Sequence, residues 1–255
     1  MQKKSFLVAG NWKMNPVTVK DADRLAKGVK KYTTTTKRVQ TVVFPPVLYL
    51  NTLASYVSKK YMTGAQDIFW MESGSYTGQI AVPMIIAMKA SHVLLGHSEV
   101  RALGETDDHI SKKLQTVLKY GLTPILCVGE SVRDTEGWYL HTIKKQIEQC
   151  LVGVDKKHIK NIVIAYEPIW AIGKNAVREA TPNEASEMAI YIKKVLSLIY
   201  DTKIVADVRV LYGGSVTSQN CISFLQDGHV DGVLVGRESL DIKKFGKIIT
   251  QIDAL

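Results

Sequence analysis

Short apolar runs rich in β-branched residues recur eight times along this chain, and a segment with helical periodicity follows each run. Runs this short and this apolar indicate strands that are buried on both faces. Strands that alternate with helices imply a parallel sheet whose strands are joined by crossover helices. The eight runs occupy residues 6–9, 41–44, 62–65, 93–96, 124–128, 162–166, 208–212 and 232–235.

Eight such units within 255 residues fit a closed (β/α)8 barrel of the α/β class, the TIM barrel, and an open doubly wound sheet is the alternative. Clear helical segments lie at 21–32, 108–120, 138–151 and 183–200. We find no low-complexity linker and no change of composition, and 46% of the residues are hydrophobic, which is ample for one core. We therefore expect one barrel domain over residues 1–255.

Local patterns also predict which side chains these elements bury. The threonine run 33–36 is interpreted as an exposed connection, and Cys127 is expected in the core because it lies within an apolar strand. In the segment 183–200 the apolar residues recur at steps of three and four, which predicts one buried helix face. That face comprises Ala185, Met188, Ala189, Ile192, Leu196 and Ile199.

The chain is basic, with 33 Lys and Arg against 24 Asp and Glu, or a net charge of +9. A basic surface suits nucleic acids, membrane surfaces or anionic metabolites. The basic pairs, such as Lys30–Lys31 and Lys193–Lys194, are scattered over predicted helices and form no tract with interleaved aromatic residues. This pattern favours a solvated surface. We therefore expect neither a nucleic acid nor a membrane as partner.

The cysteine pattern indicates in which kind of cellular compartment the protein works. Three cysteines without a CxxC motif argue against a disulfide framework and favour a reducing compartment. No histidine or cysteine cluster has metal-ligand spacing, so we expect no metal and no cofactor. The N-terminal apolar run is too short for a signal peptide, and no segment reaches the ~20 apolar residues of a spanning helix. These features predict a soluble cytoplasmic protein.

Glu167 is a lone carboxylate at the point where the strand run 162–166 ends. Pro168 fixes one backbone angle and removes a donor, so the chain leaves the strand there. The next helix signal comes only at Thr181, with Pro182 at the first helical position. A carboxylate at a strand end beside a loop long enough to move suggests that Glu167 is a general base and that the loop is its lid.

Polar residues follow other predicted strands as well. In a barrel the C-terminal strand ends form the face that carries the active site, so these residues meet on one face. A single histidine at a strand end, or a Gly-Gly-Ser turn, is more often structural. Only their joint placement favours a functional interpretation. The residues are Asn11 and Lys13 after the first strand, His97, Ser98 and Glu99 after the fourth, Gly213, Gly214 and Ser215 after the seventh, and Gly236 and Arg237 after the eighth.

The last two of these loops carry bare backbone N–H groups. The loops after strands seven and eight of a barrel commonly hold a phosphate. Glycine lets the backbone approach an anion without a Cβ in the way. The alternative is that both loops are tight turns with a structural role only. We expect Gly214, Ser215, Gly236 and Arg237 to contribute to a phosphate site.

The assembled set comprises a base (Glu167), an electrophile (His97), a fixed cation (Lys13) and a phosphate site, without a metal or a paired nucleophile. Such a set suits proton abstraction next to a carbonyl on a small phosphorylated substrate. The base takes the proton, and the other two side chains stabilise the charge on the oxygen of an enediol or enediolate. A closed lid strengthens these interactions because it excludes water.

These residues stand in motifs that closely resemble the triosephosphate isomerase family, in order and over the whole chain. The motifs are AGNWKMN at 9–15, LGHSE at 95–99, AYEPIWAIG at 165–173, YGGSV at 212–216 and LVG at 234–236. The resemblance implies a TIM barrel that interconverts glyceraldehyde 3-phosphate and dihydroxyacetone phosphate in glycolysis and gluconeogenesis. The glutamate base, neutral histidine and closing lid are known properties of that family, so their assignment here rests on the resemblance.

The resemblance also implies roles for single residues. Glu167 shuttles the proton, His97 is the neutral electrophile, Lys13 supplies positive charge and Asn11 holds the substrate. Supporting residues are Ser98, Glu99 beside the lysine, the apolar pair Ile172 and Leu234 that closes over the base, and Thr77, which reaches into the site of a partner subunit. The family is typically a homodimer for that reason. The phosphate is held by N–H groups of Gly173, Gly214, Ser215 and Gly236, together with Arg237.

The chain departs from the family pattern in four places. The lid between Gly173 and Pro182 is two residues longer than usual. Only one arginine, Arg101, follows Glu99, and Gln79 stands where the family usually has a glutamate that pairs with an arginine across the dimer interface. We therefore predict an interface that forms without that ion pair. Arg237 and Glu238 replace the usual small residues after Gly236.

Two further interpretations remain open on the residues alone. Another phosphate-binding barrel isomerase or lyase would share the last two loops, but has no reason to carry both Asn11 with Lys13 and His97 with Glu167. A catalytically weak barrel that binds phosphometabolites would be expected to have lost Lys13, His97 or Glu167, and all three are present.

Overall fold

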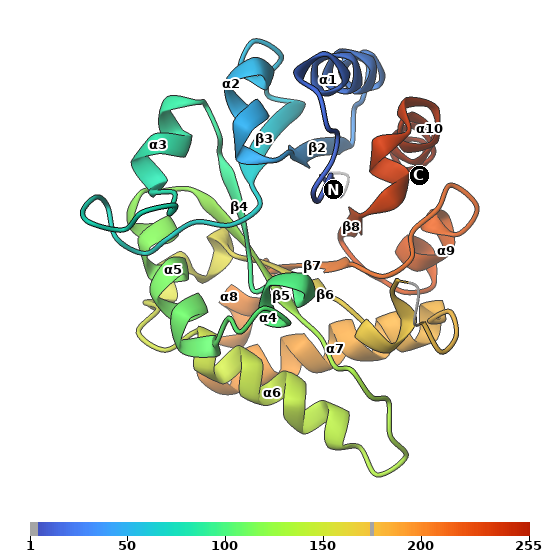
Figure 1. Cartoon of the computed structure of the whole chain (residues 1–255). Coiled ribbons are helices and arrows are strands. Elements are labelled where there is room, and N and C mark those ends of the chain that lie inside the picture. Colours follow the sequence, from blue (N-terminus) through green and yellow to red (C-terminus); the bar gives the residue numbers. More distant parts are fainter. Residues whose placement is uncertain (1–4, 174–175) are drawn as a thin grey trace.

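The computed structural model describes residues 5–173 and 176–255 of the chain. Eight parallel strands pair in sequence order, and β8 returns to β1, so the sheet is a closed barrel (Figure 1). The predicted (β/α)8 fold is confirmed, and the open doubly wound sheet is wrong. The strands are β1 (Phe6–Asn11), β2 (Val39–Phe44), β3 (Tyr61–Ala65), β4 (His92–Leu95), β5 (Thr123–Val128), β6 (Val163–Tyr166), β7 (Arg209–Tyr212) and β8 (Gly232–Val235).

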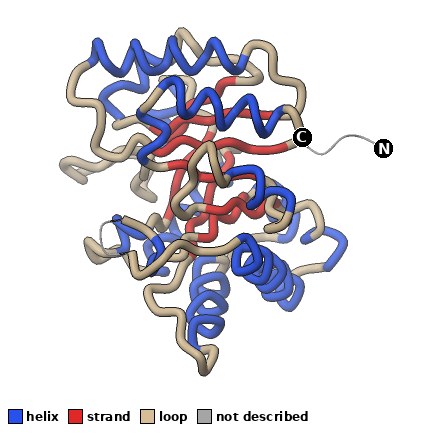
Figure 2. Tube along the Cα trace, turned by 90° about the vertical axis from the view of Figure 1, so that its right-hand side faces the viewer, coloured by secondary structure: helices blue, strands red, loops and turns tan. Residues whose placement is uncertain are grey.

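Helices surround the barrel and connect its strands (Figure 2). The α-helices are α1 (Val19–Thr33), α2 (Leu50–Leu53), α3 (Val82–Ala87), α4 (Ser98–Arg101), α5 (Asp107–Lys119), α6 (Trp138–Cys150), α7 (Pro182–Ile199), α8 (Thr202–Val205), α9 (Cys221–Gln226) and α10 (Ile242–Asp253). Short 3-10 helices are η1 (Val47–Tyr49), η2 (Lys156–Asn161), η3 (Ile169–Ala171) and η4 (Arg237–Leu240).

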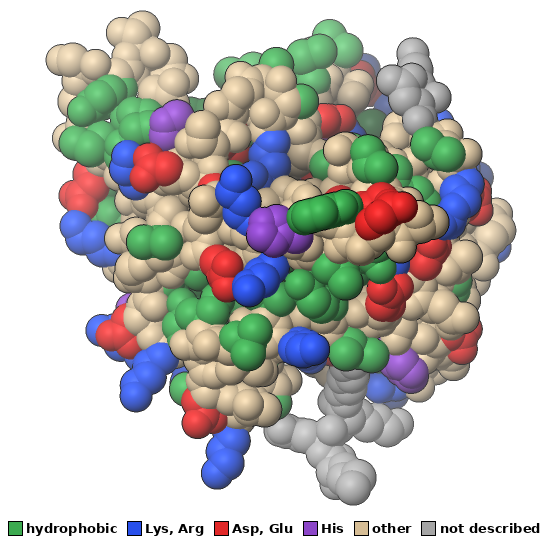
Figure 3. Space-filling view, turned by 90° about the horizontal axis from the view of Figure 1, so that it is seen from below, with side chains coloured by type: hydrophobic (Ala, Val, Ile, Leu, Met, Phe, Trp, Pro, Cys, Tyr) green, Lys and Arg blue, Asp and Glu red, His purple; other side chains and the backbone are tan. Residues whose placement is uncertain are grey.

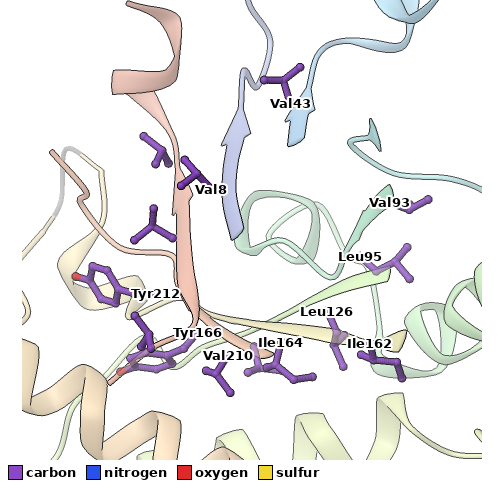
Figure 4. Packing of buried hydrophobic residues seen from close by; sticks show 14 of the residues in the cluster. Val8, Val43, Val93, Leu95, Leu126, Ile162, Ile164, Tyr166, Val210 and Tyr212 are labelled. Carbon is purple, nitrogen blue, oxygen red and sulfur yellow. The ribbon is translucent and has the colours of Figure 1, made fainter. Parts of the chain in front are cut away.

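Strand residues alternate between two apolar layers, because successive side chains of a strand point to opposite faces. Leu7, Phe44 and Leu211 belong to a cluster made from strand residues alone, which fills the interior of the barrel. Val8 and Ile164 instead join helix residues in the larger cluster between sheet and helices. Figure 4 shows strand members of this outer cluster. Both faces of the sheet are therefore buried, which explains why the strands appear as continuous apolar runs.

Two local predictions were correct only in part, and in the threonine run Thr34 and Thr35 are exposed as predicted. Ile199, at the last position of α7, is 39% exposed, and Val195 is buried instead. A helix advances 100° per residue, so a face defined over four turns drifts away from the core at its end. Thr33 belongs to α1, and both Thr33 and Thr36 are buried, with the Thr36 hydroxyl donating to the Thr33 carbonyl at 3.0 Å. Hydrogen-bonded hydroxyls let these threonines lie inside. Cys127 is fully buried, as predicted.

The basic side chains lie scattered among acidic ones on the face shown in Figure 3. No helix within residues 5–173 and 176–255 is both long and apolar enough to cross a membrane. All eight strands run in one direction, so their C-terminal ends form a single rim. That rim collects the polar residues that follow the strands.

Candidate active site

Glu167 directly follows β6 and is 2% exposed. Its backbone N–H donates to the Val128 carbonyl at 2.8 Å, which extends the pairing of β5 and β6 by one residue. Its Oε2 accepts from the Ser98 N–H at 2.9 Å, and its Oε1 lies 3.2 Å from His97 Nε2. The structure therefore brings together the carboxylate and the histidine that the sequence predicts as partners, although they stand 70 positions apart.

His97 lies between β4 and α4 and is 8% exposed. Gly96 precedes it with a φ of 70°, a conformation that favours glycine and turns the chain out of the strand. His97 Nδ1 accepts from the Glu99 N–H at 3.2 Å, and Nε2 faces Glu167. A ring nitrogen that accepts a hydrogen bond carries no proton, so the geometry assigns the proton to Nε2 of a neutral imidazole.

Lys13 has a φ of 53°, which is uncommon for a residue with a side chain. Two contacts hold this conformation. The Lys13 N–H donates to Asn11 Oδ1 at 2.9 Å, and Gln66 Nε2 donates to the Lys13 carbonyl at 2.7 Å. The Lys13 ammonium lies 2.6 Å from Glu99 Oε1. Strained backbone of this kind persists at functional sites when neighbouring residues fix it. Here Asn11 and Gln66 hold the backbone conformation of Lys13.

A cavity of about 550 Å³ lies beside these residues, and its lining joins the segments after β1, β4, β6, β7 and β8. Glu167 and His97, which are both buried, are not among the residues that line it. A side chain at Gly214 would put a Cβ 2.2 Å from the Tyr212 hydroxyl, so only glycine fits there. Predicted residues that do line the cavity are Asn11, Lys13, Glu99, Ile172, Gly173, Gly214, Ser215, Gly236 and Arg237.

The turn after β7 is held by its own polar groups. Asn220 Nδ2 donates to the Ser215 carbonyl at 2.9 Å, and Asn220 Oδ1 accepts from the Thr217 N–H at 2.8 Å. Ser215 Oγ donates to the Ala171 carbonyl at 3.2 Å, which links this turn to the start of the lid. Ser215 itself is exposed to the cavity. The turn is therefore fixed where it lines the cavity.

The predicted lid begins after Glu167, and its residues 174 and 175 lie outside the described part of the chain. The helix after it starts as predicted, with Thr181 as cap and Pro182 at the first helical position. Glu184 completes a capping box with Thr181. Arg178 also binds Glu184, at 2.5 and 3.0 Å, and stacks 4.4 Å from the Trp170 ring. The longer lid is thus tied to α7 and to η3.

Glu130 supports the site, although the sequence analysis assigns it no role. It is 2% exposed, and its Oε1 accepts from the Tyr166 hydroxyl and from Trp170 Nε1, both at 2.8 Å. Burial raises the pKa of the Glu130 carboxyl, and these two hydrogen bonds oppose that rise. Its position after the fifth strand was visible in the sequence, but no motif connects it with Tyr166 or Trp170, so its role is clear only in three dimensions.

The remaining predicted residues occupy different environments. Leu234 is 3% exposed within the inner cluster of the barrel, and Ile172 is half-buried. Thr77 lies in the loop 71–79, all of whose residues are exposed, and it does not line the cavity of its own chain. Beneath the site, burial and the nearby charge of Glu167 raise the pKa of the Cys127 thiol well above its usual value, so this thiol is neutral.

Comparison with known proteins agrees with this geometry. The sequence model of the family described as triosephosphate isomerase matches residues 6–252. A triosephosphate isomerase from Rhodopirellula baltica is 38% identical over 247 residues, which cover 96% of each chain. One from Dictyoglomus thermophilum is 37% identical over 95% of this chain and 98% of its own, and one from Natranaerobius thermophilus is 35% identical over 95% and 94%. This chain belongs to the triosephosphate isomerase family.

Proposed function

We propose that this enzyme interconverts glyceraldehyde 3-phosphate and dihydroxyacetone phosphate through an enediolate, with Glu167 as the base. The observation that carries the proposal is the contact of a buried carboxylate with a neutral imidazole on the rim, next to a strained lysine. The carboxylate removes a proton from the carbon next to the carbonyl and returns it to the neighbouring carbon. Atoms balance without a metal or a cofactor, because the product is an isomer.

Glu167 must turn before it can act, because its buried carboxylate does not line the cavity and accepts the Ser98 N–H. We propose that the bound substrate draws the carboxylate away from Ser98 and into the cavity. The lid then closes over it and excludes water, which strengthens every charge interaction in the site. The apolar side chains of Ile172 and Leu234 are suited to exclude water from the carboxylate in the closed state.

His97 and Lys13 stabilise the negative charge that develops on the substrate oxygen. The His97 Nε2 proton is available for this oxygen once Glu167 has left it. The Lys13 ammonium adds a fixed positive charge, and its pairing with Glu99 holds it in place. Asn11 holds the lysine backbone, so its contribution to substrate binding is partly indirect. The phosphate occupies the end of the cavity formed by Gly173, Gly214, Ser215, Gly236 and Arg237.

We also propose that the enzyme is a homodimer through the loop 71–79 that carries Thr77. Large apolar side chains are exposed in the segments that follow β1, β2, β3 and β4. Exposed apolar side chains of this kind suit an interaction surface. The exposed side chains include Met14 at 92%, Val17 at 89%, Leu48 at 79%, Tyr76 at 42%, Met84 at 52% and Leu103 at 89%. The three free cysteines are buried, and we place the enzyme in the cytoplasm.

The interface forms without the usual ion pair, because Arg101 points inward. Its Nε donates to the Gly96 carbonyl at 2.8 Å, and its Nη1 binds Asp107 at 2.6 Å. Val100 and the exposed Gln79 carry no charge for a partner. Mass-resolved sizing of the purified protein tests the dimer, and a monomer at every concentration examined would contradict it.

The base is tested with Glu167→Gln in a coupled assay with glyceraldehyde 3-phosphate. We expect turnover to be abolished while an enediolate-like phosphate ester binds within about tenfold of wild type, because the phosphate contacts are separate from the base. Glu148→Gln, on the surface of α6, is the matched control and should keep full activity. A Glu167→Gln enzyme near the wild-type rate would refute the base. A wild type that binds phosphate esters without turnover would favour a phosphometabolite-binding barrel.

A further inference from the structure

Arg237 occupies a distinctive place at the phosphate end of the cavity. It directly follows Gly236 at the end of β8 and begins η4. Its side chain is exposed, and it lines the same cavity as Gly214 and Ser215. The family pattern usually has a small residue at this position, so the long cationic side chain is a property of this chain. It rests at the rim where the phosphate of a substrate would enter.

The backbone beneath Arg237 is rigidly held. Ser239 is fully buried, and its hydroxyl lies 2.6 Å from the Gly236 carbonyl and 3.3 Å from the Asn11 carbonyl. The neighbouring carboxylate of Glu238 is taken up by Lys244 of α10, at 3.1 Å. The turn therefore holds the backbone of Arg237 in place, and the carboxylate of Glu238, which lines the same cavity, is already paired with a cation that does not line it.

Arg237 has no partner within the described part of the chain. No hydrogen bond, ion pair or ring contact of its guanidinium is found there, although each of the other arginines makes one. Those pairs are Arg24 with Asp21, Arg38 with the Phe6 ring, Arg101 with Asp107, Arg133 with Glu187, Arg178 with Glu184 and Arg209 with Gln40. A guanidinium without a partner among the described residues, on a residue that lines the cavity, is available to an anion.

We infer that the Arg237 guanidinium binds the substrate's phosphate directly and is a specificity-determining residue for phosphomonoesters. The inference rests on the proposed function and extends it. The planar guanidinium offers two parallel N–H donors to phosphate oxygens. The Lys13 side chain lies close to the same turn, since a Cβ on Gly236 would lie 3.6 Å from Lys13 Cε. The proposed phosphate site therefore has two cations, Lys13 and Arg237, in its lining.

Arg237 therefore contributes to ground-state binding more than to chemistry. The phosphate group does not react, so its contacts are the same in substrate and transition state. Loss of Arg237 should raise KM and the inhibition constants of phosphate ligands together, and leave kcat nearly unchanged. The residue is exposed, so solvent screens the interaction and the expected effect is roughly three- to tenfold. The effect should shrink in concentrated salt, where the Debye length is a few ångströms.

The test compares Arg237→Gln and Arg237→Lys with wild type, with Arg24→Gln on the outer helix α1 as the charge-matched control. Inorganic phosphate and glycerol 3-phosphate are the probes, measured as competitive inhibitors and by titration calorimetry. We expect Arg237→Gln to weaken both ligands roughly three- to tenfold, Arg237→Lys to recover part of the loss, and Arg24→Gln to match wild type. Binding of glycerol 3-phosphate within 1.5-fold of wild type (~0.2 kcal/mol) in Arg237→Gln would overturn the inference.

The other outcomes are equally distinct. Equal weakening by Arg237→Gln and Arg24→Gln would mean a general effect of surface charge and would overturn the inference. A loss of kcat with unchanged inhibition constants would show a structural role and would also overturn it. If the proposed function is wrong, the wild-type enzyme does not turn over triose phosphates, which the activity assay shows independently of the variants. In that case calorimetry with phosphate still decides whether Arg237 binds the anion.

Discussion

A single methyl group at Gly129 should displace the proposed base. Gly129 follows β5 and lies against the backbone of Glu167, so that an alanine Cβ would stand 1.9 Å from the Glu167 carbonyl oxygen. The two atoms would have to separate by more than about 1 Å to reach a normal contact. Gly129 cannot yield easily, because Gln146 binds both its N–H and its carbonyl, each at 2.9 Å. The movement therefore falls on Glu167.

The expected loss follows from this displacement. A misplacement of about 1 Å costs on the order of 100-fold in rate, because the base no longer reaches the proton in line. We expect kcat of Gly129→Ala to fall about 100-fold in the coupled assay, with binding of glycerol 3-phosphate nearly unchanged because the phosphate contacts lie on other loops. Overpacking should also lower the free energy of unfolding by about 1–3 kcal/mol, which a urea titration at constant protein concentration measures.

Gly28→Ala separates stability from catalysis. Its Cβ would stand 2.5 Å from Ile242 Cδ1, where α1 packs against α10 on the outside of the barrel. This variant should lose stability by the same overpacking and keep kcat within about twofold. A folded Gly129→Ala enzyme with kcat within about threefold of wild type would refute the reasoning that the Glu167 backbone sets the position of the base.

Two further predictions concern stability and the lid. His92 is 5% exposed, and burial, with a smaller effect from the charge of Arg209, lowers its pKa to about 4 from an ordinary value of 6.5. The unfolded chain binds the His92 proton more tightly, so the contribution of neutral His92 to the free energy of unfolding is present above pH 6.5 and falls as the pH drops toward 4. The expected fall is about 2 kcal/mol between pH 7 and pH 5. Urea titrations that give the same change of unfolding free energy with pH for wild type and His92→Gln would contradict this prediction. Arg178→Ala removes the contacts of the lid with Glu184 and Trp170. Limited proteolysis within residues 173–181 should therefore become about threefold faster. An unchanged cleavage rate would show that Arg178 does not hold the lid.

The barrel could be predicted from the sequence because burial on both faces of a parallel sheet is visible as apolar runs. Each of the predicted runs became a strand, with ends displaced by at most a few residues. The chemistry was visible for a related reason. Glu167, His97 and Lys13 each stand where a strand ends, and the closed sheet gathers all strand ends on one rim. Periodicity was less informative at the end of α7, where Ile199 was assigned to the buried face, and the threonine run gave no sign that Thr33 is buried at the end of α1.

The contacts within the site required the tertiary structure. Glu167 meets the Ser98 N–H across 69 positions, and Gln66 fixes the Lys13 backbone across 53. Glu130 meets Trp170 in the same way. Local sequence records which side of an element is buried, but the identity of the neighbour depends on how the barrel closes and on the register of its strands. The sequence by itself determined the fold and the common face of the candidate residues, whereas closure of the barrel decided the contact of His97 with Glu167, the buried position of Glu167 and, among the described residues, the lack of a partner for Arg237.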